Sequence, residues 1–296
     1  MAAVTNATVA ATVAENINTE WINATTVRSL NRKPYLYDLA VLKRDLRGKN
    51  TATYSHPILA EIAAAGSHTE TDLVTSVKID RSDVTVGTAV YYQATMLSYP
   101  AIQRSMWTEF EVAISEVTGA CKRKINDDFV ALATGFSNSI GSNATNFTVS
   151  NLVTMTTTWR AQTASTQEMP ILFAHGDQFR DLNNDAISNG AAIFGNTMGV
   201  QLVDAVGSTN QGQLAVFNGV RLVSTDDMPV GDTTGWTGML LATGENDAAI
   251  ALAINQDIMV EISHLPERLG YYVIASVDYG IGEVNDTAGL GVISRT

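Results

Sequence analysis

The histidines are the side chains of this 296-residue chain with the widest catalytic use, and they are scattered along it. No two of His56, His68, His175 and His264 stand at a spacing typical of metal ligands. Asp177 follows His175 across one glycine, and such a turn could orient a general base or hold a metal. The sequence supplies no third ligand, so a plain turn is the competing interpretation. An intracellular hydrolase that uses His175 and Asp177 stays open as an alternative.

Other short motifs lack residues that the catalytic or binding motifs they resemble require. Lys49 follows Gly48 as in a phosphate loop, but the earlier glycine is absent and Asn50 replaces the Ser or Thr. Cys121 is the single cysteine and cannot form an internal disulfide. Its place on an apolar helical stripe predicts a buried core residue rather than a nucleophile. The sequence therefore predicts a protein that is not an enzyme and needs neither a cofactor nor a metal.

A long amphipathic helix is the clearest structural element of the sequence. Between about Met106 and Thr134, apolar residues recur at steps of three or four or their multiples, which places them along one stripe. The stripe contains Trp107, Phe110, Ile114, Val117, Cys121, Ile125 and Leu132. At a rise of about 1.5 Å per residue, the helix is roughly 43 Å long. A spine of this length suits a flat, elongated subunit better than a globule around a pocket.

The composition predicts a folded protein. A hydrophobic content of 45% with 16% charged residues excludes general disorder. The sequence has no apolar run long enough to span a bilayer, and residues 1–12 lack the features of a signal peptide. We therefore expect synthesis in a cytoplasm and no membrane partner. A surface adhesin, which the many Asn and Thr residues could suggest, would need an export signal.

The net charge of −12 is unevenly distributed. Residues 1–124 carry 13 Lys and Arg against 12 Asp and Glu, whereas residues 125–296 carry 5 against 18. Seven of the basic residues fall between Arg28 and Lys49. Such a segment could contact acidic surfaces on neighbouring copies of the chain, which we favour, or the phosphates of nucleic acid. The second is disfavoured because the segment lacks regularly interleaved aromatic residues and the rest of the chain repels phosphate.

The first hundred residues predict an arm and a long excursion rather than a compact unit. Residues 1–27 show little hydrophobic periodicity beyond a short stretch around Trp21. Residues 50–97 hold two segments rich in β-branched and aromatic residues around a polar stretch at 66–72, which predicts a two-stranded excursion. An isolated hairpin is marginally stable in water, so we expect the excursion to lie on another molecule.

A mixed α/β region follows a Gly/Ser/Asn loop over 135–146. The expected elements are a helix over 148–164, a strand over 170–174, a helix over 177–188, a hairpin of 214–217 with 220–223, and strands over 238–242, 258–262 and 271–277. Asn218 and Gly219 suit the two positive-φ positions of a type I′ turn. The buried side of the first helix is expected to contain Val149, Leu152, Val153, Thr156 and Trp159. The whole pattern indicates an α+β fold.

Three stretches link this order of elements to a known family. They are Ile171-Leu172-Phe173-Ala174-His175 leading into a helix with Phe179 and Leu182, the hairpin 217–223 followed by 224–229, and Tyr279-Gly280. Over about residues 30–296, the ordered pattern resembles the major capsid protein of tailed bacteriophages. The same fold builds encapsulin shells and the floor of herpesvirus capsids.

The resemblance implies a phage major-capsid-like α+β fold in five parts. They are an N-terminal arm over 1–49, an extended two-stranded loop over 50–97, a peripheral domain with the spine helix over 98–145, an axial domain over 146–254, and strands over 255–296 that return to the peripheral or axial region. The arm and the loop hold too little apolar sequence for a core of their own. A chain lacking residues 1–49 should therefore stay folded and fail to assemble.

The function implied by the resemblance is structural. Hexamers and pentamers of the chain would form an icosahedral virion capsid around double-stranded DNA in a bacterial host cytoplasm, without DNA sequence specificity. Arm-like sequence follows Met1 almost at once, so a separate scaffolding protein is an expected partner, beside a portal and a decoration protein. An encapsulin-type cellular compartment is the nearest alternative. Expected intersubunit contacts are Trp21, Arg28, Arg32, Lys33, Arg44, Arg47, Lys49, Tyr54, His68, Lys78 and Arg81.

Some relatives of this family also join their subunits through Lys–Asn isopeptide links. Lys78, with Asn255 as its partner and Glu261 as a base, has the residue types that such a link needs. Residue type alone supports this chemistry here. We expect interlocking of subunits or a decoration protein to stabilise the shell instead.

Overall fold

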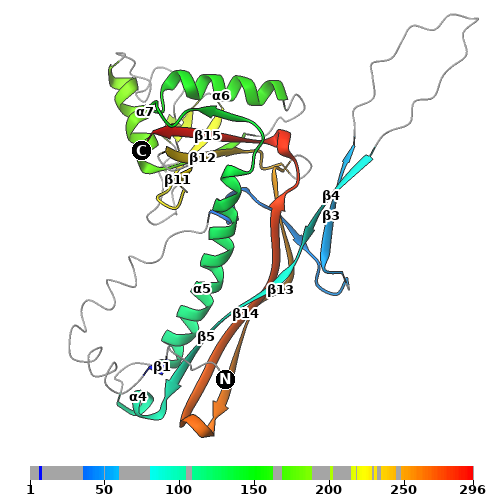
Figure 1. The fold of residues 1–296 in the computed structure, drawn as a ribbon, viewed down its shortest axis with the longest axis vertical. Coiled ribbons are helices and arrows are strands. Elements are labelled where there is room, and N and C mark those ends of the chain that lie inside the picture. Colours follow the sequence, from blue (N-terminus) through cyan, green and yellow to red (C-terminus); the bar gives the residue numbers. More distant parts are fainter. Residues whose placement is uncertain are drawn as a thin grey trace, which may run out of the picture.

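The computed structural model arranges the described parts of the chain in two regions that meet end to end (Figure 1). In the described residues, one region combines a long helix with a five-stranded sheet, here the spine sheet, and the other contains an eight-stranded sheet, here the mixed sheet. This arrangement confirms the predicted α+β fold class. The structure describes residues 7–8, 36–49, 51–59, 81–104, 109–162, 169–188, 201–202, 215–217, 219–228, 230–231, 235–244 and 248–295.

The predicted spine is helix α5 (Glu109–Ala131), which the short 3₁₀ turn η1 (Leu132–Thr134) continues. Its buried residues confirm the predicted stripe along most of its length, while Trp107 lies outside the described residues. Cys121 is buried as expected, and burial raises the pKa of its thiol, so the group stays protonated. The buried stripe contains Ala113, Val117, Cys121, Ile125 and Phe129.

The spine helix lies along one face of the spine sheet. The strand order in this sheet is β1 (Ala7–Thr8), β5 (Ala89–Ser98), β14 (Gly270–Glu283), β13 (Ile250–Leu265) and β2 (Leu42–Asp45). Alternate residues of β14 from Val273 to Tyr279 are buried, as the two-residue period of a strand requires for the face that packs on α5. The short helix α4 (Tyr99–Arg104) follows β5 at the far end of the sheet (Figure 1).

Strands β13 and β14 are much longer than the sequence predicted. They pair antiparallel from Ile250 opposite Glu283 to Leu265 opposite Gly270, whereas the expected strands covered 258–262 and 271–277. The sequence analysis overlooked the apolar run Ile250–Ile254 of β13. In β14 the added residues Asp278, Gly280 and Gly282 are polar or small and alternate with apolar ones. A search for apolar runs misses such residues because the ladder needs only their backbone groups.

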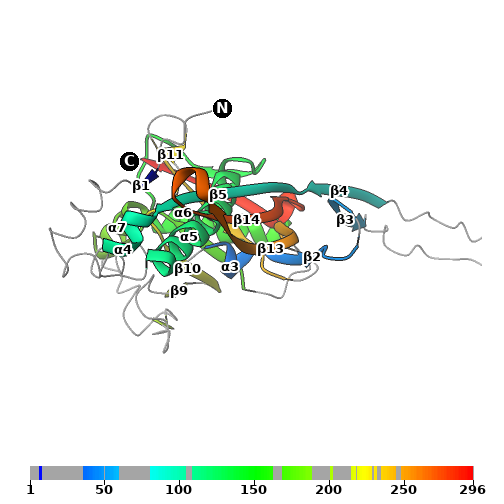
Figure 2. The same cartoon turned by 90° about the horizontal axis from the view of Figure 1, so that it is seen from below.

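The two-stranded excursion is shorter than the predicted range 50–97. Strand β3 (Thr53–Leu59) pairs antiparallel with β4 (Arg81–Gly87), and the N–H of Thr88 donates to the carbonyl of Ala52 at 2.8 Å to close the base. Strand β5, which was expected in the excursion, pairs with β14 in the spine sheet instead. Strands β4 and β5 follow one another along a single line in Figure 2, so the hairpin continues the sheet outward.

The end of the predicted arm belongs to the core. Helix α3 (Tyr37–Ala40) contributes the buried side chains of Tyr37 and Ala40, and Leu46, directly after β2, is buried as well. The N–H of Leu36, which is also buried, donates to Oδ1 of Asn126 on the spine at 2.8 Å. The expectation that residues 1–49 lack a core is therefore wrong for 36–46. The reason is that short apolar stretches such as Leu36-Tyr37 pack against distant elements whose position the local sequence does not reveal.

The mixed sheet brings together strands from the whole C-terminal half. The order among the described strands is β6 (Ser139–Gly141), β15 (Gly289–Arg295), β12 (Gly235–Leu241), β7 (Ile171–Ala174), β10 (Val220–Ser224), β9 (Ala215–Phe217) and β8 (Gln201–Leu202), with β11 (Val230–Gly231) beside β12. The predicted hairpin is confirmed, because Val220 pairs with Phe217 and Gly219 has a φ of 79°. Strand β15 lies within residues 255–296, where strands were expected, although the sequence analysis gave it no bounds of its own.

Two helices accompany the mixed sheet at the upper end of Figure 1: α6 (Val149–Gln162) and α7 (Gly176–Ser188). The buried face of α6 contains Leu152, Met155, Thr156 and Trp159. Val153 was expected on this face but is 40% exposed. It lies beside the helix face that Leu152 and Met155 form, so its side chain points away from the core. The described helices include none that is long and apolar enough to cross a lipid bilayer.

Candidate assembly surfaces

The His-Gly-Asp turn is a packed structural turn at the start of α7. The ring of His175 stacks on Trp236, with ring centroids 3.4 Å apart, and its Nδ1 lies 3.1 Å from the backbone N–H of Asp177, which donates to it. The buried side chain of Gln178 accepts the N–H of His175 at 3.0 Å and donates to Oγ of Ser294 at 2.9 Å. These contacts already use the nitrogen that a general base at this turn would need.

The hydrolase alternative requires a third polar partner that contacts His175 and Asp177. The carboxylate of Asp226 approaches the turn at Gly176, where a Cβ would lie 3.3 Å from its Oδ1, but no hydrogen bond or ion pair among the described residues joins Asp226 to His175 or Asp177. Asp177 is paired with Arg180 at 2.8 Å on the surface of α7. Within the described ranges, no group of three or more His, Cys, Asp or Glu side chains is placed to hold a metal ion. The geometry therefore gives the hydrolase alternative no support.

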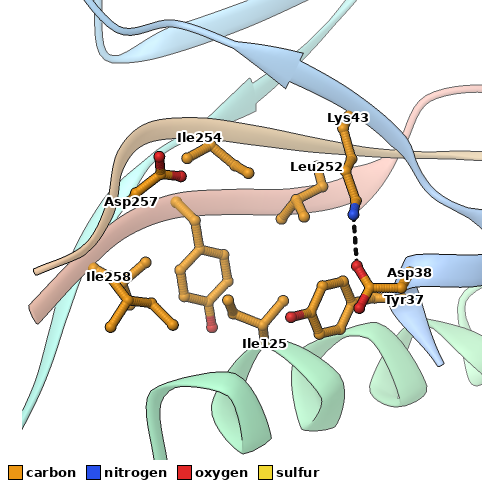
Figure 3. A pocket seen from close by; sticks show the side chains of 10 residues that line it. Tyr37, Asp38, Lys43, Ile125, Leu252, Ile254, Asp257 and Ile258 are labelled. Atoms are coloured by element: carbon orange, nitrogen blue, oxygen red, sulfur yellow. Dashed lines mark hydrogen bonds and ion pairs between the residues drawn. The ribbon is translucent and has the colours of Figure 1, made fainter. Parts of the chain in front are cut away.

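A small pocket lies between the spine helix, β13, β14 and α3 (Figure 3). Its volume is about 140 Å³, whereas sites for small molecules usually measure about 300–1,000 Å³. Apolar side chains such as Ile125, Leu252 and Ile254 form much of its wall, and the ion pair of Lys43 with Asp38, at 2.5 Å, lies at its edge. We interpret it as a gap in packing between the helix and the sheet.

The residues predicted as intersubunit contacts fall into two groups. Those that are described lie on β2, on the turn after it, or on the hairpin: Arg44, Arg47, Lys49, Tyr54 and Arg81. Trp21, Arg28, Arg32, Lys33, His68 and Lys78 lie outside the described residues. The structure thus places the first group on the side of the subunit from which the hairpin projects (Figure 1).

Several described charges of this segment are paired within the chain. Arg47 contacts Asp45 at 2.6 Å and also pairs with Asp257 of β13. Hydrogen bonds from Arg47 lower the pKa of Asp45 to about 2, so this carboxylate stays ionised. Arg81 contacts Asp83 on its own strand at 2.8 Å. All of these pairs are exposed, so they contribute little to stability and leave the side chains accessible to another molecule.

The residues considered for a covalent link do not form a site within one chain. Asn255 donates from Nδ2 to Oδ2 of Asp278 at 2.6 Å. Glu261 lies six residues further along β13, which corresponds to roughly 20 Å of extended strand. A base at that distance cannot act on Asn255 in the same subunit. Lys78 lies outside the described residues.

The sequence analysis missed an exposed apolar area on the spine sheet. Val90 and Tyr92 of β5 are 66% and 74% exposed, and Met259 of β13 is 46% exposed. Tyr92 pairs with Ser276, which pairs with Met259, so these side chains form one row across three strands. Because the neighbours of Ser276 on β14 are buried toward α5, this row lies on the opposite face. We call this surface the open sheet face.

The edges of the spine sheet are also only partly covered in the described part of the chain. Strand β2 pairs with β13 over Ala251–Ile254, and β1 pairs with β5 at Met96 and Leu97. The remaining lengths of β13 and β5 present backbone groups without a described strand partner. Such edges are templates for pairing with a further strand.

Comparisons with known proteins agree with this architecture. No protein-family model and no curated protein sequence matches the chain. Among solved structures, the chain is similar to the capsid structure of Helicobacter pylori bacteriophage KHP30, with a TM-score of 0.65 and 11% identity over 94% of this chain and 92% of that one. The capsid structure of cyanophage P-SCSP1u gives 0.65 and 11% over 90% and 89%.

A shell protein from a cell is similar to the same degree. The SrpI encapsulin of Synechococcus elongatus, solved as a holo complex, has a TM-score of 0.63 and 10% identity over 90% of this chain and 94% of that one. These identities are too low to carry function, but the likeness extends over almost the whole of each chain. The chain therefore has the fold of tailed-phage major capsid proteins, which encapsulin shell proteins share.

Proposed function

We propose that the chain is a major capsid protein that assembles as hexamers and pentamers into an icosahedral shell around double-stranded viral DNA. The observation that carries the proposal is the open sheet face together with the projecting hairpin. Both expose apolar or strand-forming residues that a subunit on its own does not bury. Repeated copies of the chain would cover them, and many weak contacts then add up to a stable shell.

The hairpin supports this proposal by its composition. Its paired residues alternate, so that His56 and Val86 are buried while Thr53, Ser55 and Thr85 are exposed. In the described part of the hairpin, the base contacts the body, where Val86 belongs to a small cluster with Leu46 and Val284. A two-stranded ribbon with so little core is marginal in water. A neighbouring subunit is the support that the proposal supplies.

The proposed partners follow from the same function. The chain would contact itself, a separate scaffolding protein, a portal and packaged DNA, and a decoration protein could bind the shell. The predicted contacts on the basic segment, from Arg44 to Lys49, would meet acidic surfaces of a neighbouring copy. The acidic remainder of the chain would keep DNA from adhering to the shell. The proposed location is the virion capsid, formed in the cytoplasm of a bacterial host.

An encapsulin-type compartment is the second candidate function. The observation in its favour is the similarity to the SrpI encapsulin, whose TM-score of 0.63 is close to the 0.65 of the cyanophage capsid. The two candidates differ in content rather than in subunit architecture. Shells purified from the natural source would hold double-stranded DNA in the first case and protein cargo in the second.

The experiment that tests the proposal shortens the hairpin without touching its base. Residues 57–83 are deleted and His56 is joined to Val84 by Asn-Gly, because these two residues already stand opposite each other. We expect a folded subunit with unchanged circular dichroism that no longer forms shells under the electron microscope. As a control, the full-length chain is expressed in parallel.

Two results would contradict the proposal. The full-length chain could remain a monomer of about 32 kDa when expressed alone and with its neighbouring genes. The shortened chain could instead form complete shells as stable as those of the full-length chain, which would remove the hairpin from the assembly contacts.

A further inference from the structure

The two regions of the subunit are joined by chain segments that lie against one another. Among the described residues, the crossings run from η1 to β6, from β12 to β13 and from β14 to β15. The N–H of Val284 donates to the carbonyl of Ala249 at 2.9 Å. The N–H of Ala242 donates to the carbonyl of Ala288 at 3.0 Å. A Cβ on Gly289 would lie 1.9 Å from the ring of Phe136. The relative orientation of the two regions is therefore set at this junction.

Two acidic side chains bond to each other inside the junction. Glu283, the last residue of β14, forms a side-chain hydrogen bond with Asp286 in the 3₁₀ turn η3 (Asp286–Ala288). Oδ1 of Asp286 also accepts the N–H of Ser137 at 2.9 Å. The pair thus connects the β14 to β15 crossing with the η1 to β6 crossing. A hydrogen bond between two carboxyl groups requires a proton on one of them, because an ionised carboxylate only accepts.

The surroundings place this proton on Glu283. A Cβ on Gly135, directly after η1, would lie 3.5 Å from Oε2 of Glu283, so the carboxyl lies where the helix dipole disfavours negative charge. Burial, together with the hydrogen bond and charge of Asp286, raises the pKa of Glu283 to about 7. Burial opposes ionisation of Asp286, but hydrogen bonds from Ser137 and Glu283 lower its pKa.

In the described part of the chain, no cation is among the groups that shift the pKa of Glu283. Asp286 is the ionised group that acts on Glu283 in the described part of the chain, and the start of β13 presents Ile250 opposite it. Further back on α5, Asp127 and Asp128 are also acids. Asp128 is already bonded to Lys124 at 2.5 Å and to the hydroxyl of Tyr279 at 2.6 Å.

We propose that Glu283 and Asp286 form a proton-dependent latch between the two regions of the subunit. The latch is closed while Glu283 donates its proton to the carboxylate of Asp286. When the proton leaves Glu283 for solvent, the two carboxylates repel each other and the contact with Ser137 weakens. The latch belongs to the folded subunit, so it does not depend on the proposed shell function.

The sign of the pH dependence follows from the direction of the pKa change. The pKa of Glu283 is raised from 4.5 to about 7, so between these values the folded junction holds a proton that the opened junction has lost. The closed junction is therefore favoured at the acidic end of this range. Its stability falls as the pH rises from about 4.5 to about 7.

Hydrogen exchange at defined pH tests the latch. Protection of the amides of Ser137 and Val284 is measured from pH 5 to pH 8 by mass spectrometry and corrected for intrinsic exchange rates. In the natural chain we expect the open population to increase at least about tenfold over this range, since one pKa unit corresponds to a tenfold change in an equilibrium constant. Glu283→Gln keeps a donor to Asp286 but does not titrate, so its protection should be flat.

A second variant and a control complete the test. Asp286→Asn can still accept from Ser137 and donate to Glu283, and it removes the charge of Asp286 while the burial of Glu283 remains. Its profile should therefore be shallower than that of the natural chain, which keeps the test available if Glu283→Gln does not fold. Glu261→Gln removes an exposed carboxylate of β13 and should retain the natural slope. A flat profile in the natural chain, or the natural slope in Glu283→Gln or in Asp286→Asn, overturns the proposal.

Discussion

The two regions of this subunit bury their apolar residues in different ways. All four residues of β7 in the mixed sheet are buried, and Met239, Leu240 and Leu241 of the neighbouring β12 are fully covered. In the spine sheet, β13 begins with four buried residues and continues with a largely exposed half. The central strands of the mixed sheet are thus buried on both faces, whereas the spine sheet leaves one face open over much of its described length.

This difference explains how a subunit can be stable and still depend on its neighbours. The core that extends from the spine helix into the mixed sheet supplies the free energy of folding. The open sheet face, the hairpin and the free strand edges contribute little to that free energy. They are the surfaces that assembly would cover. Substitutions in the core should therefore change the free energy of unfolding, and substitutions on these surfaces should change assembly.

The largest expected effect is on folding, from Phe173→Ala in β7. Phe173 is fully buried and packs edge to face on Phe129 of the spine helix, with ring centroids 5.7 Å apart at 85°. We expect the free energy of unfolding to fall by about 3–5 kcal/mol, measured by urea denaturation. Met259→Ala on the exposed half of β13 is the control and should cost less than about 1 kcal/mol. Equal losses would end the distinction between the two regions.

A smaller effect is expected on assembly, from Val90→Ser on the open sheet face. Val90 is 66% exposed, so the subunit should fold as before. If a neighbour covers it, the loss of about 1–2 kcal/mol per contact should raise the concentration needed for assembly roughly five- to thirtyfold. Val153→Ser on α6 makes the same chemical change at a position 40% exposed and should leave this concentration unchanged. Light scattering against protein concentration measures both, and an effect only in Val153→Ser would reverse our assignment of the surface.

The smallest expected effect concerns the hairpin base at low pH. His56 is buried beside Tyr54, whose hydroxyl lies 3.0 Å from its Nδ1, and burial together with the nearby charge of Arg44 lowers its pKa. The folded state therefore favours neutral His56, and stability should be lost as the pH falls below about 6.5. Glu283 acts in the opposite direction over the same pH range, so the effect is measured by calorimetry as a difference: the Tm of the natural chain should decrease by a few degrees relative to that of His56→Gln.

His56→Gln should remove this decrease because the replaced side chain does not titrate. His264→Gln changes an exposed histidine at the far end of the spine sheet and should behave like the natural chain. The acid response of His56 is opposite in sign to that of Glu283, so the hairpin base and the junction can be told apart by their pH profiles alone. Identical pH profiles of Tm for the natural chain and His56→Gln would show that His56 does not cause the loss of stability at low pH.

Much of the fold was predictable because its signals are local. The apolar period of α5, the apolar strand β7 and the Asn-Gly turn before β10 each depend on residues within a few positions of one another. The full lengths of β13 and β14 were not predicted in this way. The missed parts, 250–257 and 278–283, are held by pairing with each other and with the distant strands β2 and β5. The same reason hid the role of β5, which the sequence grouped with the hairpin.

The candidate surfaces were predicted less completely than the fold. The sequence pointed to the basic segment around Arg44 and Arg47, and several of its charges turned out to be paired within the chain. It did not reveal the open sheet face, because exposure of Tyr92 and Met259 depends on which face of the sheet the spine helix covers. It did reduce the case for catalysis at His175, which the stacking on Trp236 weakens further.

By itself, the sequence determined the elements of this protein: a long spine, an extended excursion, a following α/β region and an uneven distribution of charge. Tertiary structure alone decided which faces stay open and which groups meet, such as Asp286 and Ser137, which lie 149 positions apart. Short-range periodicity sets secondary structure because neighbouring side chains share a face. Exposure and pKa depend on long-range packing, which brings remote residues together.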